Sequence, residues 1–226
     1  MAACRLAFES IFCLIIFYTF SGFSKPGAAL FMQIELLHKH LSSIVKISHE
    51  ECDYMLSLAK EFLLKKKEHF FINGEIAKYV GFIQKGCLRY YYIDEKGEDH
   101  IIYFAQEEWW IGDLDSFYRD VPTNTNLQAL EETIIYAFDK KNFDTIRSEI
   151  PAFDEYVKKR HAKATSARLD DMMAQRSTTA EDRYLKLLSS FPDIFQRVPQ
   201  HYIASYLGIK PESLSRIRKK LYQKRN

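Results

Sequence analysis

Two side chains near the C-terminus have the types and the spacing that the reading of DNA bases requires. Glu212 and Arg216 lie four residues apart, so a helix would present both on one face. The arginine could donate two parallel hydrogen bonds to guanine O6 and N7, and the glutamate could accept one from cytosine N4. Pro211 and Ser213 stand beside them, and we take these four residues as the candidate base contacts.

The surrounding residues would supply contacts to phosphates. The last thirty residues hold eight Lys or Arg and one acid, whereas the other 196 hold 24 basic and 29 acidic residues. Such an asymmetry favours a polyanion as the partner. Cations that neutralise phosphates make the affinity fall steeply as the salt concentration rises. The candidate phosphate contacts are Gln200, Lys210, Ser215, Arg218, Lys219 and Lys220.

The apolar spacing indicates two short helices that would position these side chains. Residues that recur every three or four positions would form their buried stripes: Ile203, Ala204, Leu207, Leu214, Ile217 and Leu221. Gly208 would end the first helix in a left-handed cap, and Pro211 fits the first turn of the second. This layout is typical of a helix-turn-helix. An ordinary terminal helical hairpin with a solvated basic face remains the alternative, and the fixed offsets favour DNA.

The middle of the chain is predicted to be β-structure. Short runs rich in aromatic and β-branched residues alternate with glycines, over residues 70–74, 79–83, 87–93, 100–105, 126–130 and 133–138. Asp94 to Gly97 is a good hairpin turn. From Met32 to Leu64 the apolar residues instead recur at helical spacing, with a capping box from Ser48 to Glu51. The expected class is α+β, with an N-terminal antiparallel β-roll, or jelly roll.

A long helix is expected after the β-structure, because the stretch from Pro151 to Gln175 contains no further proline and no glycine. Its apolar seam consists of Phe153, Val157, Ala164, Ala167 and Met172. So narrow a stripe suits packing against a second copy, although docking onto the β-roll alone stays open. A homodimer would place two recognition helices about 34 Å apart on a near-palindromic site of double-stranded DNA.

The predicted domains are an uncertain extension (1–31), the β-roll (32–150), the dimerisation helix (151–176) and the helix-turn-helix domain (177–226). In the extension, the uncharged run from Ile11 to Phe20 would make about 15 Å of helix, half the thickness of a bilayer core. We therefore expect no membrane anchor. Three interpretations stay open: a start codon placed upstream of a protein that opens at Met32, a secretory signal, or a structured extension.

Other chemistries find little support in the sequence. The four scattered cysteines form no Cys-x-x-Cys pair, which favours reduced thiols in the cytoplasm and disfavours a local zinc or iron–sulfur site. His38 and His40, two apart on a predicted helix, would point away from each other. We expect no metal site and no catalytic residues.

With its β-roll, long helix and helix-turn-helix, the chain resembles the Crp/Fnr family of bacterial transcription regulators from about Met32 to Leu221. The family's strand-and-turn rhythm is matched at residues 72–75, 81–86, 94–97 and 110–114, and its helix-turn-helix at 204–221. Glu212 and Arg216 fall on the family's base-reading positions. The resemblance implies a homodimer joined along the long helix, a ligand in each β-roll, DNA as the target, and RNA polymerase as a further partner.

One departure concerns the ligand. Members that bind cyclic nucleotides follow a Gly-Glu-Leu, after about ten residues, with an arginine that pairs with the cyclic phosphate. Here the corresponding pocket residues are Gly112, Asp113, Leu114, Thr123 and Asn124, and the stretch from Pro122 to Asn126 contains no cation. A buried phosphate without that partner would lose several kcal/mol, by order of magnitude. We therefore expect no cyclic nucleotide and no cofactor, with the effector unknown.

These observations favour a dimeric, sequence-specific DNA-binding transcription regulator that is not an enzyme. The alternative is a β-barrel protein that binds a small ligand, or an enzyme, with an incidental basic tail.

Overall fold

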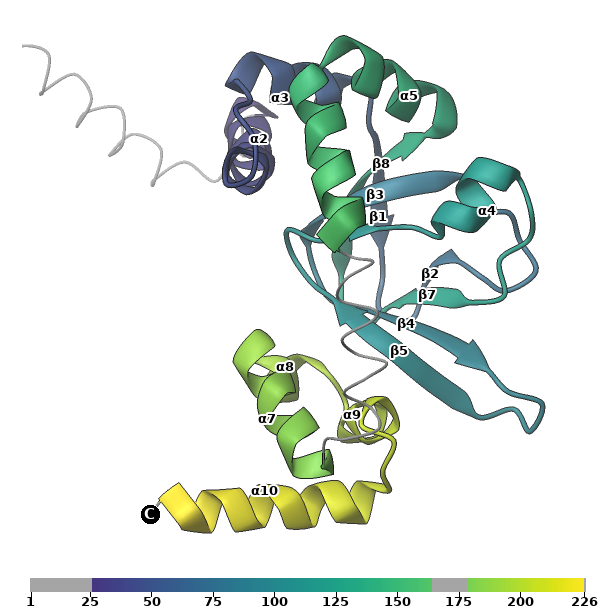
Figure 1. The fold of residues 1–226 in the computed structure, drawn as a ribbon, viewed down its shortest axis with the longest axis vertical. Coiled ribbons are helices and arrows are strands. Elements are labelled where there is room, and N and C mark those ends of the chain that lie inside the picture. Colours follow the sequence, from purple (N-terminus) through teal and green to yellow (C-terminus); the bar gives the residue numbers. More distant parts are fainter. Residues whose placement is uncertain (1–25, 164–178, 226) are drawn as a thin grey trace, which may run out of the picture.

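The computed structural model describes residues 26–163 and 179–225. Its centre is a pair of antiparallel four-stranded sheets. Sheet A has the order β1 (Lys60–Leu64), β8 (Thr133–Asp139), β3 (Tyr79–Lys85), β6 (Trp110–Ile111). Sheet B has the order β2 (His69–Phe71), β7 (Asn126–Ala129), β4 (Leu88–Ile93), β5 (Asp99–Ala105). The predicted antiparallel β-roll is therefore confirmed (Figure 1).

The two sheets enclose an apolar core of alternating strand residues. Its buried members are Phe71, Ala77, Ile83, Leu88, Ala105, Ile111, Leu127, Ile135 and Ala137. Gly86 joins β3 to β4 at a φ of 112°, and a Cβ there would lie 2.8 Å from the Thr133 Cα. Only glycine fits this turn. In the hairpin between β4 and β5, Gly97 donates its N–H to the Asp94 carbonyl over 3.0 Å, as the turn prediction requires.

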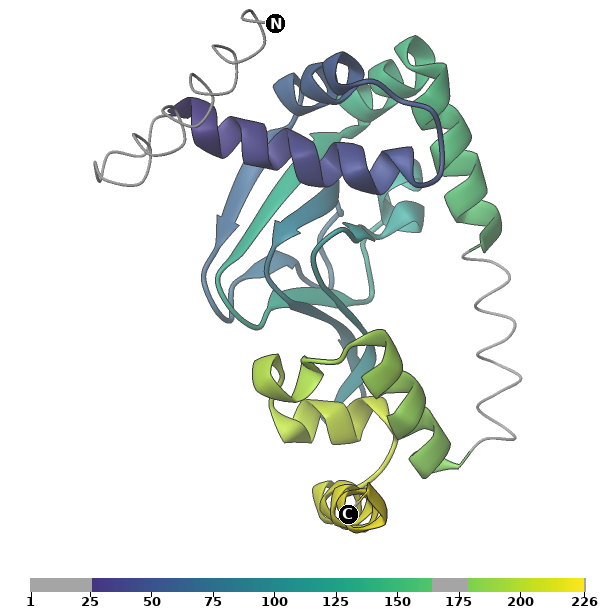
Figure 2. The same cartoon turned by 90° about the vertical axis from the view of Figure 1, so that its left-hand side faces the viewer.

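Four helices cover the outer face of sheet A (Figures 1 and 2). They are α2 (Pro26–Ser42), α3 (His49–Ser57), α5 (Lys140–Glu149) and the helical residues 151–163. Leu37 and Leu41 of α2 and Ile146 of α5 pack in one buried cluster with strand residues such as Phe82. The predicted capping box of Ser48 and Glu51 is present at the start of α3.

The structure corrects several expectations in this region. Residues 60–64 continue the predicted helical spacing but form β1, because antiparallel pairing with β8 outweighs the local pattern. The boundary expected at residue 32 falls inside α2, which begins at Pro26. Two helices were not predicted, α5 and the short α4 (Leu114–Arg119).

Part of the predicted apolar seam of the long helix is buried against the chain's own β-roll. Phe153 is fully buried, and Val157 is 8% exposed, in the cluster that its own β-roll makes. Both residues therefore contact their own β-roll, and the intermolecular seam stays a prediction. Ala164, Ala167 and Met172 lie outside the described residues. From Lys158 to Lys163 all side chains except Arg160 are exposed, so the helix leaves the body of the domain there.

The C-terminal domain contains α7 (Ala180–Ser190), α8 (Ile194–Arg197), α9 (Gln200–Tyr206) and α10 (Pro211–Arg225). A capping box of Thr179 and Asp182 opens α7. This domain packs on the outer face of sheet B, opposite the helices of sheet A (Figures 1 and 2). Within the described residues, no helix has both the length and the apolar character needed to span a bilayer.

Candidate nucleic-acid interface

Helices α9 and α10 meet at a tight turn. Gly208 has a φ of 64°, and the Ile209 N–H donates to the Ala204 carbonyl over 3.0 Å. A Cβ added to Gly208 would meet nothing within 4 Å, so the backbone conformation, and not lack of space, favours glycine. Pro211 opens α10 as expected. Two helices joined by a tight glycine turn are therefore present at the predicted positions.

The apolar stripes of both helices face each other and α7. Ile203, Ala204, Leu207 and Leu214 are each at most 1% exposed, and Ile209, Ile217 and Leu221 pack against them. Arg183 of α7 donates to the Leu207 carbonyl over 2.8 Å, which ties the end of α9 to α7. The stripe therefore fixes which side of α10 looks outward.

The outward side of α10 carries most of the predicted DNA contacts. The exposed residues are Pro211, Glu212, Ser215, Arg216, Lys219 and Lys220. Ser213 is half-buried, and its hydroxyl accepts a hydrogen bond from Arg216 Nη2 at 3.1 Å. Figure 1 shows α10 at the far end of the molecule from the two sheets. Glu212 and Arg216 thus lie on one solvent-facing side, one turn apart.

The candidate phosphate contacts are not equivalent. Gln200 at the start of α9 and Lys210 before α10 are exposed. Lys220 Nζ lies 2.6 Å from Glu181 Oε2, so it would have to exchange this carboxylate for a phosphate. The Arg218 guanidinium stacks on Phe195, 4.4 Å from the ring centroid, and turns partly inward. Lys219 lies on the same exposed side as Arg216.

The predicted ligand pocket is occupied by a chain of hydrogen bonds. Asp113 caps α4 by accepting from the Ser116 N–H, and its other oxygen accepts from the Thr123 hydroxyl over 2.6 Å. The Thr123 and Thr125 hydroxyl oxygens lie 2.9 Å apart, and Thr125 donates to the Tyr90 hydroxyl over 2.8 Å. One carboxylate and three hydroxyls are thereby linked.

The structure brings Asp113 and Thr123 together as expected, whereas Leu114 and Asn124 are exposed. Gly112 lies against β3, where a Cβ would come within 3.3 Å of Val80. The sequence reasoning missed Thr125 and Tyr90. Tyr90 lies on β4, and only the pairing of β4 with β7 brings it beside the loop, so no local signal could have identified it.

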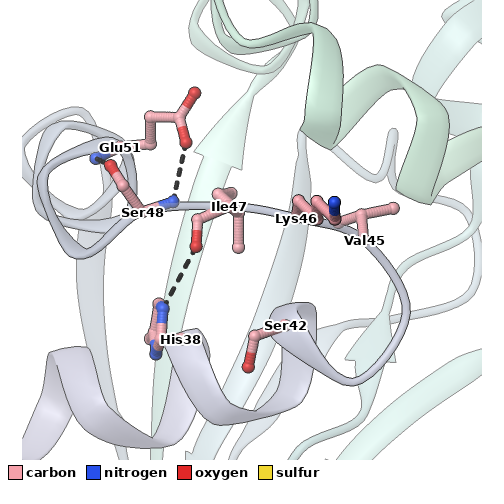
Figure 3. Close-up of a pocket in the computed structure, with 7 residues that line it drawn as sticks. All are labelled: His38, Ser42, Val45, Lys46, Ile47, Ser48 and Glu51. Atoms are coloured by element: carbon pink, nitrogen blue, oxygen red, sulfur yellow. Dashed lines mark hydrogen bonds between the residues drawn. The ribbon is translucent and has the colours of Figure 1, made fainter.

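Two other polar clusters have structural explanations. An open hollow of about 560 Å³ lies between α2 and α3 (Figure 3). Its His38 donates to the Ile47 carbonyl over 3.1 Å, while Ser48 and Glu51 form the capping box. At the tip of the β4–β5 hairpin, Asp94, Glu98 and His100 come together. There Asp94 accepts the N–H groups of residues 96 and 98, which accounts for it as a turn residue.

The histidine pair of α2 diverges, as predicted. His38 stacks on His49 at 3.6 Å, whereas His40 Nε2 lies 2.8 Å from the Tyr156 hydroxyl. Burial and the nearby Arg160 lower the pKa of His40, although Glu108 opposes this shift. His40 is therefore a contact between α2 and the helix at 151–163.

Comparison with known proteins agrees with the β-roll. Residues 61–149 match the cyclic nucleotide-binding domain family. No curated protein sequence matches the chain.

Solved structures with the same fold include the c-di-GMP-responsive global regulator CLP of Xanthomonas campestris (TM-score 0.63, 11% identity, 78% of this chain and 93% of that one). CooA of Carboxydothermus hydrogenoformans has a TM-score of 0.59 and 20% identity, over 75% of this chain and 79% of that one. FixK2 of Bradyrhizobium japonicum has a TM-score of 0.58 and 19% identity, over 74% and 85%. Residues 61–149 thus match the cyclic nucleotide-binding domain family, and the chain shares the fold of the Crp/Fnr regulators.

Proposed function

We propose that this chain is a dimeric, sequence-specific DNA-binding transcription regulator whose β-roll senses an effector other than a cyclic nucleotide. The observation that carries the proposal is the outward side of α10. Its N-terminal half presents Glu212 and Arg216 to solvent, while Leu214 on the opposite side is fully buried. A helix held in this way can enter the major groove with its polar residues against base edges.

The first experiment is selection of duplexes from a random library, followed by binding at two salt concentrations. We expect a preferred near-palindromic sequence and an affinity that falls steeply with salt, because lysines and arginines displace counterions from phosphates. Absence of duplex binding, or binding independent of salt, would contradict the proposal. It would favour a small-ligand-binding protein or enzyme with an incidental basic tail.

Arg216→Ala and Lys219→Ala separate base reading from phosphate contact. Both residues are exposed cations on α10. Arg216→Ala should cost about 1–3 kcal/mol at one base position and relax the sequence preference there. Lys219→Ala should weaken binding to all sequences alike and reduce the salt slope by about one. If the arginine variant also weakened all sequences equally, Arg216 would be a phosphate contact instead.

The pocket chemistry supports an effector other than cyclic AMP or GMP. The Asp113 carboxylate accepts from the Thr123 hydroxyl, and the neighbouring stretch 122–126 brings no cation to pair with a phosphate. A phosphate buried there would lack its charge-assisted partner. Isothermal titration calorimetry with cyclic AMP and cyclic GMP should therefore show no micromolar binding, and such binding would overturn this part of the proposal.

The dimer rests on the helix that begins at residue 151. Its first two turns are anchored by Phe153 and Val157 in the chain's own core, and its exposed continuation points away from that core. The remaining seam, Ala164, Ala167 and Met172, is proposed from the sequence. Ala167→Glu should shift the protein from dimer to monomer in sedimentation analysis, whereas an unchanged dimer would exclude this seam. Contact with RNA polymerase and a cytoplasmic location follow from the proposed role.

A further inference from the structure

We propose that an ionic clasp between Arg197 and two glutamates of the β-roll positions the C-terminal domain, and with it the recognition helix α10. This inference rests on the proposed function, since positioning matters for a dimer that must meet two half-sites. The clasp residues are Arg197 at the end of α8, Glu107 in the loop before β6, and Glu131 in the loop before β8.

The clasp has the geometry of a chelated guanidinium. Arg197 Nη1 and Nη2 donate to the two Glu107 oxygens over 2.9 and 2.8 Å, a bidentate pair. Nη2 and Nε also donate to one Glu131 oxygen, over 2.6 and 3.2 Å. The Arg197 side chain is 17% exposed, and the two glutamates are about a third exposed. Contacts of this kind to a largely desolvated arginine fix direction as well as distance.

Glu107 is itself fixed to the β-roll. Its carboxylate accepts the Gly86 N–H over 2.7 Å at the turn between β3 and β4. Burial favours the protonated form of Glu107, but the hydrogen bonds from Arg197 and Gly86 outweigh it and lower the pKa. The acid is therefore ionised at neutral pH in the docked structure, and the Gly86 N–H ties it to the β-roll side of the boundary.

Two further contacts on β5 and β4 define the angle of docking. The Ser205 hydroxyl of α9 donates to the Asp99 carbonyl over 2.8 Å and accepts the Ile101 N–H over 3.3 Å. The Arg89 guanidinium is sandwiched between Tyr91 at 3.8 Å and Tyr202 of α9 at 4.1 Å, measured to the ring centroids. Three separate attachment points on the β-roll therefore restrict the rotation of the C-terminal domain.

The clasp does not cover the DNA-facing side. Ser205 and Tyr202 face the sheet from α9, whereas Glu212 and Arg216 are exposed on α10, at the far end of the molecule (Figure 1). Docking therefore leaves α10 accessible while restricting where it points. In a two-fold dimer this restriction sets the separation of the two recognition helices, and so favours simultaneous engagement of both half-sites.

The first test measures docking directly, without DNA. The Ile101 amide reports on the boundary because its acceptor, Ser205, belongs to the other domain. In Glu107→Gln/Glu131→Gln we expect hydrogen exchange at Ile101 to be about tenfold faster or more, since local opening becomes easier. The single variant Glu131→Gln, which keeps the Glu107 pair, should show a smaller increase in the exchange rate at Ile101. Glu132→Gln, which removes an exposed neighbouring acid, is the matched control. Unchanged exchange at Ile101 in the double variant would overturn the clasp.

The second test separates positioning from the folding of the DNA-binding domain. A duplex with two half-sites and a duplex with one are titrated with wild type and Glu107→Gln/Glu131→Gln. We expect affinity for the full site to fall about tenfold, while the half-site changes less than about threefold, because only avidity is lost. Equal losses on both duplexes would overturn the positioning role. If wild type bound neither duplex, the proposed function and the positioning role would fail together, while the exchange result would still decide whether the clasp holds the domains.

Discussion

The outer faces of the two sheets are covered in different ways. Over sheet A, the helices bury an almost entirely apolar surface, in which Phe82 and Phe138 of the strands meet Phe153 and Leu37. Over sheet B, the C-terminal domain also contributes apolar residues, but charged and hydroxyl groups surround them. Water can replace ion pairs and hydrogen bonds, but it cannot replace buried apolar contact. Sheet A therefore has a mainly apolar cover, and sheet B has a cover in which apolar contacts are combined with ion pairs and hydrogen bonds.

The sheet B interface also has an apolar part. Tyr91, Ile101 and Phe104 of β4 and β5 join the buried cluster of the C-terminal domain. Interfaces between domains of one chain are typically more polar than cores, and relative motion across them is the default expectation. The mixed character of this boundary suits a domain that is held in place and still able to respond to the β-roll.

The largest loss of stability is expected from Phe153→Ala, which tests the apolar cover of sheet A. The ring is fully buried and packs against Trp110, Phe143 and Tyr156. Its removal leaves a cavity and should lower the free energy of unfolding by about 3–5 kcal/mol. Chemical denaturation followed by circular dichroism measures this. Leu185→Ala, at a position 42% exposed on α7, is the control and should change stability by less than about 0.5 kcal/mol. A loss at Phe153 as small as at Leu185 would show that sheet A is covered loosely.

Features that depend on neighbouring residues could be predicted from the sequence, whereas features that depend on residues far apart in the chain could not. The turn at Gly208 and the stripe through Leu214 repeat at fixed local offsets, so the sequence was enough to predict them. The helical prediction for residues 60–64 was wrong, because the partner of β1 is β8, which lies some seventy residues away. The clasp on Arg197 was missed for the same reason, since Glu107 is 90 residues distant and neither residue stands in a local motif.

The second largest effect is expected from removing the Ser205 hydroxyl, which contacts β5 across the boundary. Ser205→Ala would leave the Ile101 N–H and the Asp99 carbonyl without their partner across the boundary. Loss of partners for such groups should destabilise docking by about 1–3 kcal/mol, with little effect on sheet A. Residue-resolved hydrogen exchange measures both the weaker docking at β5 and the unchanged stability of sheet A. Faster exchange in β3 as well as in β5 would mean that the two covers are not independent.

The two covers should also respond to acid in different pH windows. His40, between α2 and the helix at 151–163, has a lowered pKa, chiefly because of burial and secondarily because of Arg160, with Tyr156 and Glu108 also facing it. The unfolded chain then binds a proton more readily, so stability over sheet A falls as the pH drops below the ordinary histidine value of 6.5.

Glu107 also has a lowered pKa, because the hydrogen bonds from Arg197 and Gly86 outweigh the effect of burial. Its contribution is present above the ordinary value of 4.5 and is lost as the pH falls through the lower value of the folded state. Exchange at α2 should therefore accelerate at a higher pH than exchange at Ile101. His40→Gln should remove only the first step, and one common midpoint would contradict the separation.

The smallest effect is expected at the stacked arginine. Arg89 is 4% exposed and is held by Asp99 and Gln128 on its own domain, so Tyr202 adds a cation–π contact to a guanidinium that is already placed. Tyr202→Leu should weaken docking by about 0.5–1 kcal/mol, and Tyr202→Phe should leave it nearly unchanged, because the ring face is retained. Exchange at Ile101 measures both. If the two variants weakened docking equally, the hydroxyl and not the ring would make the contact. The cation–π contact with Arg89 would then contribute nothing to the boundary over sheet B.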